Sequence, residues 1–216
     1  MSEIIIRKYK KEDKDSVRKI AYDTALMGES ASAFFEDEEI MQDFLTGYFL
    51  DYEPESAWVA ESQGKVIGYL LGAKDDQLVN KVAGEKILPK LLIKAVKRGV
   101  IFKKKCRAFM VNSIGSLIKG EFKSPIFYHD YPAVLHVNIA SGFRGQGIGT
   151  KLIAVYLDYL RNLKVKGVHF ATLSDKAALF YEKLGFNLLY KKSRSYLRYV
   201  LHKDINCYVF GMKLSL

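Results

Sequence analysis

A glycine-rich loop constrains the fold more than any other part of the sequence, and it reads Arg144-Gly145-Gln146-Gly147-Ile148-Gly149. The loop lies between a run with β-strand patterning, 133–139, and an amphipathic run, 150–163, so we expect it to join a strand to a helix. Alternate glycines let backbone N–H groups approach a ligand without Cβ clashes, at the positive end of a helix. Arg144 adds a positive charge. The sequence therefore predicts a phosphate-binding site that is built from this loop and the first turn of the helix.

Two familiar phosphate loops do not fit, because a Walker A motif ends in Gly-Lys-Ser/Thr and a dinucleotide fingerprint places its last glycine three positions after the second. The arrangement Arg144-x-x-Gly147-x-Gly149 instead resembles the acetyl-CoA pyrophosphate loop of the Gcn5-related N-acetyltransferase (GNAT) superfamily. A second motif follows one predicted strand later, at Ala177-x-x-Phe180-Tyr181-x-x-x-Gly185-Phe186, and it is similar to the closing helix of that superfamily. Two such motifs in the expected order identify the chain as resembling a GNAT protein.

The resemblance implies an α+β fold, an α/β/α sandwich with a mixed, mostly antiparallel twisted sheet of about seven strands flanked by helices. The hydrophobic patterns agree with it along most of the chain. Strands are predicted at 4–7, 58–61, 66–72, 133–139, 168–173, 187–191 and 207–214, and helices at 12–26, 36–48, 150–163 and 174–184. At 216 residues and 49% hydrophobic, the chain is expected to form one domain over 1–216, with 75–124 as a helical insertion between the third and fourth strands.

The insertion is strongly basic. Between residues 79 and 123 there are twelve basic side chains and two acidic ones, a net charge of +10 that equals the charge of the whole chain. Its apolar residues keep helical spacing, which predicts an amphipathic helix. A solvated lid helix, an anionic membrane surface and an acidic protein partner all remain open as explanations, and a homodimer is open as well. Nucleic acid is the least favoured partner because no recognised binding motif accompanies the charge.

Other features restrict the class of protein. Cys106 and Cys207 lie far apart, without a CxxC motif or a histidine cluster, so the sequence indicates neither a disulfide framework nor a metal site. No uninterrupted apolar run reaches the roughly 20 residues that a membrane span needs. We therefore expect a cytoplasmic protein without a metal cofactor.

The resemblance implies acetyl-CoA as the acetyl donor and assigns roles to particular residues. The pyrophosphate would lie on the loop, the pantetheine arm would pair with the backbone of the fourth strand, and Tyr181 would donate a proton to the leaving thiolate. The implied cofactor-binding residues are Val137, Asn138, Ile139, Arg144, Gly145, Gln146, Gly147, Ile148, Gly149, Thr150, Ser174 and Phe180. Because Tyr181 falls on an amphipathic helix, a core aromatic residue is its structural alternative.

The general base is not fixed by the sequence. Two-residue alternation groups Ala133, Leu135, Val137 and Ile139, all apolar, on the face where relatives carry a base, and it turns His136 the other way unless a bulge intervenes. His136 stands as the candidate catalytic base, with a buried structural histidine and a water relay as alternatives. The expected reaction is direct acetyl transfer in a ternary complex to a primary amine. A small amine or aminosugar is the first choice of acceptor, and a peptide or protein lysine is the second.

A narrower resemblance involves segments 24–33, 48–55 and 131–138. They are similar to a GNAT branch that includes the acetyltransferase-like domain of O-GlcNAc hydrolases. In the animal members this domain is a pseudo-acetyltransferase, so the fold alone does not establish activity. The alternative function is therefore a non-catalytic acetyl-CoA-binding or interaction module, whose basic insertion binds an acidic partner or a membrane surface.

Overall fold

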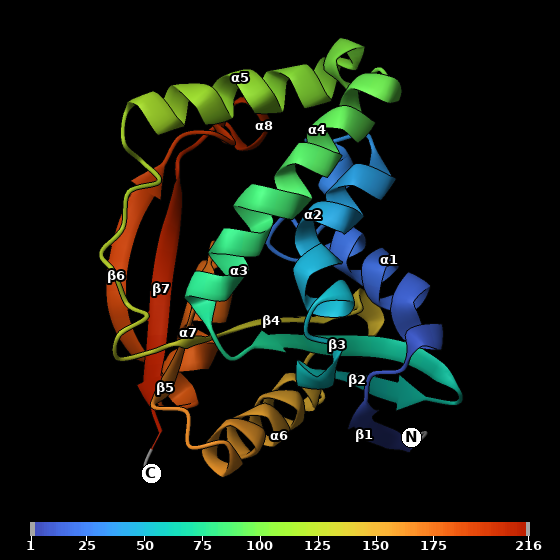
Figure 1. The fold of residues 1–216 in the computed structure, drawn as a ribbon, viewed down its shortest axis with the longest axis vertical. Helices are drawn as coiled ribbons and strands as arrows, with labels where there is room; N and C mark the ends of the chain where they lie inside the picture. The colour runs from blue at the N-terminus through green and yellow to red at the C-terminus, as the bar shows by residue number, and fades with distance from the viewer. Residues whose placement is uncertain (1–2, 215–216) are drawn as a thin grey trace.

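The computed structural model describes residues 3–214, which form a seven-stranded sheet in the order β1-β2-β3-β4-β5-β7-β6 (Figure 1). Within these residues β4 and β5 are parallel, and the other five neighbouring pairs are antiparallel. The predicted mixed, mostly antiparallel sheet is therefore confirmed. The strands are β1 (Ile4–Lys8), β2 (Ala57–Ser62), β3 (Lys65–Ala73), β4 (Ala133–Ile139), β5 (Gly167–Thr172), β6 (Asn187–Arg194) and β7 (Ile205–Lys213).

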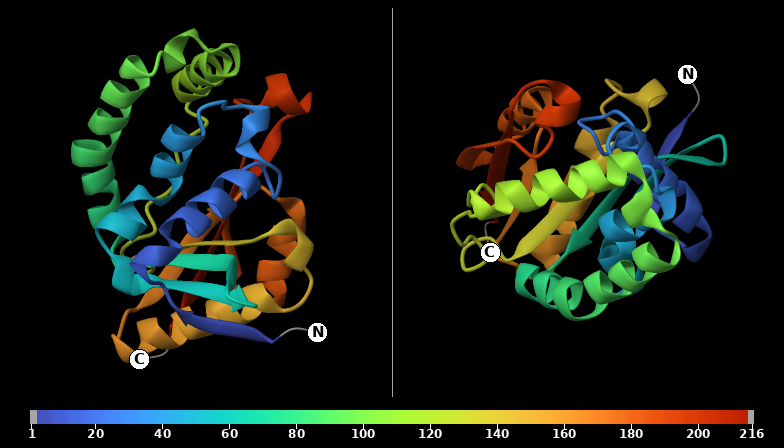
Figure 2. Two further views of the ribbon diagram at one scale, coloured as in Figure 1. Left: turned by 90° about the vertical axis from the view of Figure 1, so that its right-hand side faces the viewer. Right: turned by 90° about the horizontal axis from the view of Figure 1, so that it is seen from above.

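Helices cover both faces of the sheet, as the alternation of apolar residues along the strands requires. In β2, Trp58 and Ala60 pack in one core with α6 (Ile148–Asn162) and α7 (Asp175–Lys183). Ala57 and Val59 point the other way, into a core with α1 (Lys14–Thr24) and α2 (Glu38–Asp51). Figures 1 and 2 show these layers on either side of the sheet. A short helix, α8 (Arg198–Leu201), lies between β6 and β7 and was not predicted.

The two parallel strands separate soon after they meet. β4 and β5 pair at Ala133↔Val168 and Val134↔His169, and no further pair follows in the described strands. Both strands continue, to Ile139 and Thr172, so their carboxyl-terminal halves leave a V-shaped opening in the sheet. This opening exposes one edge of β4 immediately before the glycine-rich loop.

Tyr156 of α6 fixes the base of this opening. Its buried hydroxyl donates to the carbonyl oxygens of Ala73 at 3.0 Å and Val134 at 2.9 Å, which ties the end of β3 to the start of β4. The ring lies so close to β3 that a Cβ atom added at Gly72 would be 2.2 Å from it. The position of Tyr156 therefore depends on glycine at residue 72.

The segment between β3 and β4 is helical. It contains α3 (Asp76–Val82), a π-helical turn (Ala83–Ile87), α4 (Leu88–Lys97) and α5 (Lys104–Ile118). In Figure 1, α3 and α4 rise from the sheet beside α2, and α5 crosses over to the ends of β6 and β7. Leu91 and Cys106 of this segment are buried in a further core, separate from the two on the faces of the sheet, with Phe34, Phe35 and Ile205. The insertion is thus packed onto the sheet domain.

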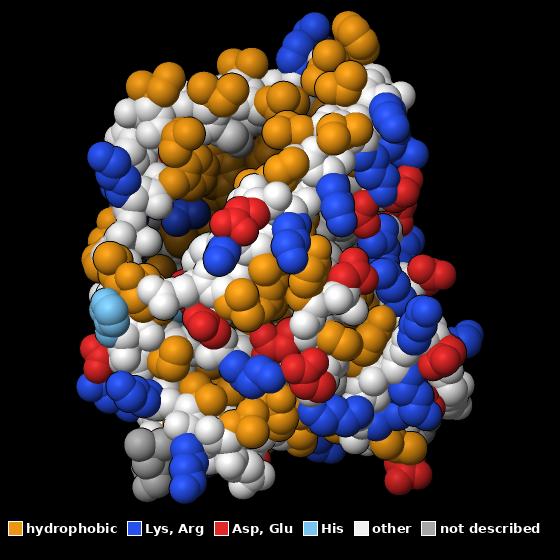
Figure 3. Space-filling model, in the orientation of Figure 1, with side chains coloured by type: hydrophobic (Ala, Val, Ile, Leu, Met, Phe, Trp, Pro, Cys, Tyr) orange, Lys and Arg blue, Asp and Glu red, His pale blue; other side chains and the backbone are white. Residues whose placement is uncertain are grey.

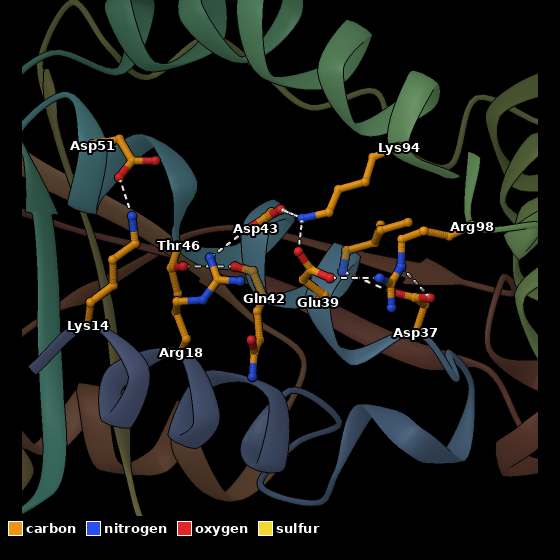
Figure 4. A network of polar contacts seen from close by, with 11 residues as sticks. Lys14, Arg18, Asp37, Glu39, Gln42, Asp43, Thr46, Asp51, Lys94 and Arg98 are labelled. Atoms are coloured by element: carbon orange, nitrogen blue, oxygen red, sulfur yellow. Dashed lines mark hydrogen bonds and ion pairs between the residues drawn. The ribbon is translucent and has the colours of Figure 1, made fainter. Parts of the chain in front are cut away.

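Ion pairs also attach the insertion to α2 (Figure 4). The carboxylate of Asp37, which has 0% exposed side-chain area, accepts from Arg98 Nε at 3.0 Å and Lys103 Nζ at 2.8 Å. Lys94 contacts both Glu39 and Asp43 at 2.5 and 2.6 Å. Lys94, Arg98 and Lys103 are therefore used within the protein, and the basic charge that faces solvent is smaller than the sequence suggests.

We expect Asp37→Asn to weaken the attachment of the insertion. Burial opposes the charge of Asp37, but hydrogen bonds from Lys103 and Arg98 outweigh it and lower the pKa of the carboxyl group. Asparagine still caps α2 through Ile40 N, so the variant should lose about 1–3 kcal/mol of unfolding free energy through the charged hydrogen bonds alone. Because the pKa in the folded state is below the unfolded value of about 3.9, this loss should be complete at pH 7 and shrink as the pH falls below about 4.

Denaturant titrations at pH 7 and pH 3 would measure this difference. Asp51→Asn is the matched control, because its ion pair with Lys14 is exposed and should contribute at most about 1 kcal/mol. Equal losses for the two variants at pH 7 would contradict the prediction.

Candidate functional site

The glycine-rich loop begins helix α6, as predicted. Gly147 is the N-cap residue with φ +74°, and Gly145 has φ +78°, a left-handed conformation that suits glycine. A Cβ atom added at either position would find open space within 4 Å. The glycines therefore do not serve internal packing, and they leave the backbone accessible from outside.

The backbone amides of this loop are available to a ligand. Among the described residues, the N–H groups from Gly145 to Thr150 donate no hydrogen bond, and the first such donor is Lys151, to Gly147. A row of free amides at the positive end of a 15-residue helix is suited to bind an anion. The residues predicted for phosphate binding thus lie together in one turn at the start of α6.

Arg144, which the sequence predicts to bind the cofactor, also makes contacts within the protein. Its Nε donates to the carbonyl of Ile139 at 3.0 Å and its Nη2 to the carbonyl of Gly28 at 2.8 Å. Two of its nitrogens are therefore engaged by the end of β4 and by the loop after α1, a contact across 116 positions of sequence. Arg144 adds charge near the loop, but its visible function is to hold these three segments together.

The open edge of β4 is formed by alternate residues. Ala140 N donates to Ile67 O across the β3–β4 ladder, so by antiparallel alternation the backbone groups of Asn138 and His136 also face β3. The groups of Val137 and Ile139 face the V-shaped opening, with the Ile139 carbonyl taken by Arg144. Val137 and Ile139 thus leave backbone groups at the open edge, whereas the backbone groups of Asn138, also predicted to bind the cofactor, face β3.

The side chains of β4 alternate without a bulge. Leu135, Val137 and Ile139 pack with α6 in one core, while the ring of His136 contacts Tyr69, which packs with α1. His136 therefore faces the helical layer that carries the loop after α1. This differs from the interpretation of the apolar positions as the acceptor-facing set, because they complete the core beneath α6.

His136 is half-buried and already has a partner. Its Nε2 lies 3.1 Å from Nδ2 of Asn138, which also donates to the Tyr69 hydroxyl at 3.0 Å. Burial lowers the pKa of His136 to about 4. The imidazole is therefore neutral at physiological pH and accepts a hydrogen bond from Asn138, as a structural histidine would.

The closing helix brings Ser174 and Phe180 near the loop. Ser174 is the N-cap of α7, and its hydroxyl accepts from Ala177 N at 3.2 Å. The ring of Phe180 lies against Gly149, where an added Cβ atom would meet it at 3.5 Å. Phe180 is thus placed as a wall beside the start of α6, while the Ser174 side chain is used to cap its own helix.

Tyr181 lies at the edge of an aromatic core. It is 7% exposed and packs against Phe170 at 4.3 Å between ring centroids, and burial raises the pKa of its phenol. Its hydroxyl has no hydrogen-bond partner in residues 3–214. In the same residues, the fully buried side-chain polar atoms without a partner are Ser113 Oγ and Arg194 Nε. The Tyr181 hydroxyl is not one of them, so part of it is accessible at the molecular surface. The Tyr181 hydroxyl therefore carries a hydrogen that it donates to no neighbouring group in residues 3–214.

The sequence analysis missed a cavity at the base of the V. It has a volume of about 280 Å³ and lies where β4 and β5 separate, with Asp76, His169 and Arg194 among its lining residues. These three side chains come from α3, β5 and β6, and no sequence motif links their positions. The position of His169 within a predicted strand was the only signal in the sequence. A larger hollow of about 810 Å³ lies near Lys14 and Asp51 and shares no lining residue with this cavity.

Comparison with known proteins decides the family. Residues 110–188, which include the glycine-rich loop and the closing helix, match a family model described as an acetyltransferase (GNAT) domain. These residues therefore carry a GNAT acetyltransferase domain. The match covers both motifs on which the resemblance rested, and the predicted membership is confirmed. No curated protein sequence matches the chain.

Solved structures share this GNAT fold over the whole chain. The structure of SsHAT has a TM-score of 0.70 and 20% identity, covering 99% of this chain and 100% of its own. A polyamine N-acetyltransferase from Drosophila melanogaster, which forms N-acetylagmatine, has a TM-score of 0.59 and 15% identity, covering 98% and 100%. The protein yncA from Salmonella typhimurium, solved with its cofactor acetyl-CoA, has a TM-score of 0.58 and 15% identity, covering 100% and 96%. At these identities the likeness establishes the fold.

Two kinds of feature are absent from residues 3–214. No helix within 3–214 has the length and apolar character to cross a membrane. In the same range no three histidine, cysteine or acidic side chains are grouped as a metal site would require. The narrower resemblance to the O-GlcNAc hydrolase branch stays a prediction.

Proposed function

We propose that this GNAT protein is an N-acetyltransferase that moves the acetyl group of acetyl-CoA directly to a primary amine in a ternary complex. The observation that carries this proposal is the row of free amides from Gly145 to Thr150, placed next to an unpaired edge of β4. The first feature suits a pyrophosphate and the second suits an extended amide-containing arm. Both features are needed to bind acetyl-CoA.

The residues present fit this donor. The amides of the loop would hold the pyrophosphate, Val137 and Ile139 would pair with the pantetheine, and Phe180 would border it. When bound, acetyl-CoA supplies the reactive thioester. The N–H groups along the β4 edge can stabilise negative charge on the thioester oxygen, because they are not used in the β3 ladder.

Tyr181 is the proposed proton donor. Burial raises its pKa, so the phenol is protonated at neutral pH, and Oη is free to give its proton to a thiolate. His136 is poorly suited to be the base. A pKa of about 4 makes it too weak an acceptor to remove a proton from an ammonium group at neutral pH, and Asn138 occupies its Nε2. We therefore place His136 among the positioning residues of β4.

A small amine is the proposed acceptor class. Structurally similar proteins include enzymes named for polyamine and agmatine acetylation, and one named for ribosomal-protein alanine, so the fold accommodates both small amines and proteins. A cavity of about 280 Å³ favours a small molecule over a folded protein surface. We also propose a cytoplasmic location, where acetyl-CoA is available.

Calorimetric titration with acetyl-CoA and with CoA tests the proposal first. We expect saturable binding of both, followed by amine-dependent release of free thiol when a panel of primary amines is added. Absence of binding by correctly folded protein would reject the proposal and favour a pseudo-acetyltransferase.

A second candidate function comes from the surface of the insertion. On α4, α5 and the turn between them, large apolar side chains face solvent next to lysines, with Phe102 79% and Ile118 81% exposed. Figure 3 shows hydrophobic side chains gathered over this part of the molecule. Lys97, Lys104 and Lys119 lie in the same segment and form none of the ion pairs of the described residues. Apolar side chains flanked by basic ones are suited to an anionic lipid interface.

Vesicle pelleting tests this membrane function. We expect the protein to sediment with phosphatidylserine-containing vesicles but not with phosphatidylcholine alone, and about 0.5 M salt should weaken the binding. Phe102→Asp with Ile118→Asp should abolish it. Phe44→Asp is the matched control, because Phe44 is 58% exposed but lies on α2. Equal loss in the control, or no sedimentation with anionic vesicles, would reject the function.

A further inference from the structure

The cavity at the base of the V lies where β4 and β5 separate, next to the open edge of β4. Its walls include Val134, which belongs to the last pair between the two strands, and Leu135 and Phe170, which follow directly on that pair. At about 280 Å³, its volume equals that of about nine water molecules at ~30 Å³ each. This is room for a compact small molecule.

Arg194 gives the cavity an uncompensated positive charge. Its Nε is buried without a hydrogen-bond partner among the described residues, and its guanidinium lies over the ring of Phe122 at 5.2 Å. The guanidinium forms none of the ion pairs in this part of the chain. An arginine without an anion is costly in this position, because its Nε donor is withdrawn from water and left unpaired. The arrangement suits a ligand with a carboxylate or a similar anion.

Asp76 and His169 form a side of the same cavity that suits a cation, in contrast to the side formed by Arg194. Asp76 Oδ2 lies 3.8 Å from His169 Nε2, and the two side chains are 21% and 12% exposed. Burial raises the pKa of Asp76, which His169 partly offsets. A carboxylate in this state gains from an added cation, so this side of the cavity suits an ammonium group.

The hydrogen bond of His169 fixes which of its nitrogens can accept a proton. Nδ1 lies 2.6 Å from the carbonyl oxygen of Tyr131, and a carbonyl can only accept, so Nδ1 carries the hydrogen. In the neutral ring the lone pair is therefore on Nε2, which faces Asp76 and the cavity. One proton can move from a bound ammonium group to Nε2 and then to solvent, leaving a neutral amine.

We infer that this cavity is the acceptor site and that the acceptor is a small zwitterion, a primary amine that also carries a carboxylate. Arg194 binds the carboxylate, and the amine lies toward Asp76 and His169, where His169 takes its proton. This inference rests on the proposed acetyltransferase function and adds the charge of its acceptor. It excludes a polyamine as the preferred acceptor, because Arg194 would repel the cationic end of a polyamine that took the place of the carboxylate.

Matched acceptors that differ only in the carboxylate test the inference. Thiol release would be measured with lysine against cadaverine, ornithine against putrescine and serine against ethanolamine, using the full chain with saturating acetyl-CoA. We expect kcat/KM to be about 10- to 100-fold higher for the carboxylated member of a pair, the range of one hydrogen bond to a charged group. Equal or better use of the decarboxylated amines would overturn the inference.

Variants at Arg194 identify the residue responsible. Arg194→Gln should remove the preference mainly through KM, and Arg194→Lys should restore part of it. Arg198→Gln is the matched control, since Arg198 pairs with Asp204 on the surface and lies outside the cavity. His169→Asn should lower kcat while leaving the preference for carboxylated acceptors. A preference that survives Arg194→Gln would overturn the assignment of the carboxylate site.

Titration with CoA beforehand separates the two levels of inference. If the folded protein fails to bind CoA, the acetyltransferase function is rejected. If it binds CoA and acetylates polyamines but not amino acids, that function stands and the zwitterionic acceptor is rejected. If it binds CoA but no carboxylated amine binds to the CoA-saturated protein by calorimetry, the acceptor assignment is likewise rejected.

Discussion

Gly147→Glu should weaken acetyl-CoA binding by at least ~100-fold, a loss of about 2.7 kcal/mol or more. The new side chain would project from a position whose surroundings are open, so the structure can accept it without a clash. Its carboxylate would stand next to the free amides at the start of α6 and repel a pyrophosphate. The measurement is a calorimetric titration of wild type and variant under the same conditions.

Backbone strain must be separated from the loss of the site. Gly147 has φ +74°, and a residue with a Cβ atom in this conformation costs about 1–2 kcal/mol. Gly64→Glu is the matched control, because Gly64 has φ +73° and equally open surroundings, in the turn between β2 and β3. Both variants should lose similar stability, and only Gly147→Glu should lose cofactor affinity. Unchanged affinity in a folded Gly147→Glu protein would move the cofactor away from this loop.

Arg144 shows where sequence-based reasoning reaches its limit. The glycines of the loop could be predicted because their roles are local: each depends on its own φ angle and on the helix that follows. The partners of Arg144, by contrast, include Gly28, which is 116 positions away. Nothing in the spacing of the loop indicates that contact. Arg144→Ala should therefore not be combined with Gly147→Glu in one variant, because the two changes disturb different interactions.

The same distinction applies to the strands and the cavity. Alternation along β4 predicted correctly that His136 and Leu135 face opposite ways, but only the packing of α6 shows which layer each one meets. Asp76, His169 and Arg194 meet because three separate elements, α3, β5 and β6, border one opening. Their juxtaposition is a product of the tertiary fold, so no local pattern could have revealed it. Likewise, the basic residues of the insertion could be counted in the sequence, but their ion pairs with acidic residues of α2 could not be predicted from it.

Tyr181→Phe should lower kcat by about 100-fold or more, the range expected when a general acid is removed, with little change in acetyl-CoA affinity. The phenyl ring keeps its packing against Phe170, and the lost hydroxyl has no partner in the described part of the chain. The unfolding free energy should therefore stay within about 0.5 kcal/mol of the wild type. The measurements are steady-state kinetics on an identified acceptor and a denaturant titration.

Tyr156→Phe is the control that separates catalysis from structure, because it removes the same atom from another buried tyrosine. There the hydroxyl donates its one hydrogen to the carbonyls of Ala73 and Val134, so its loss removes a shared buried hydrogen bond and should cost about 1 kcal/mol of stability. The two variants should thus show opposite profiles: Tyr181→Phe loses turnover and keeps stability, and Tyr156→Phe loses stability first. If Tyr181→Phe retains full kcat, Tyr181 is a core aromatic residue, and the thiolate must take its proton from solvent.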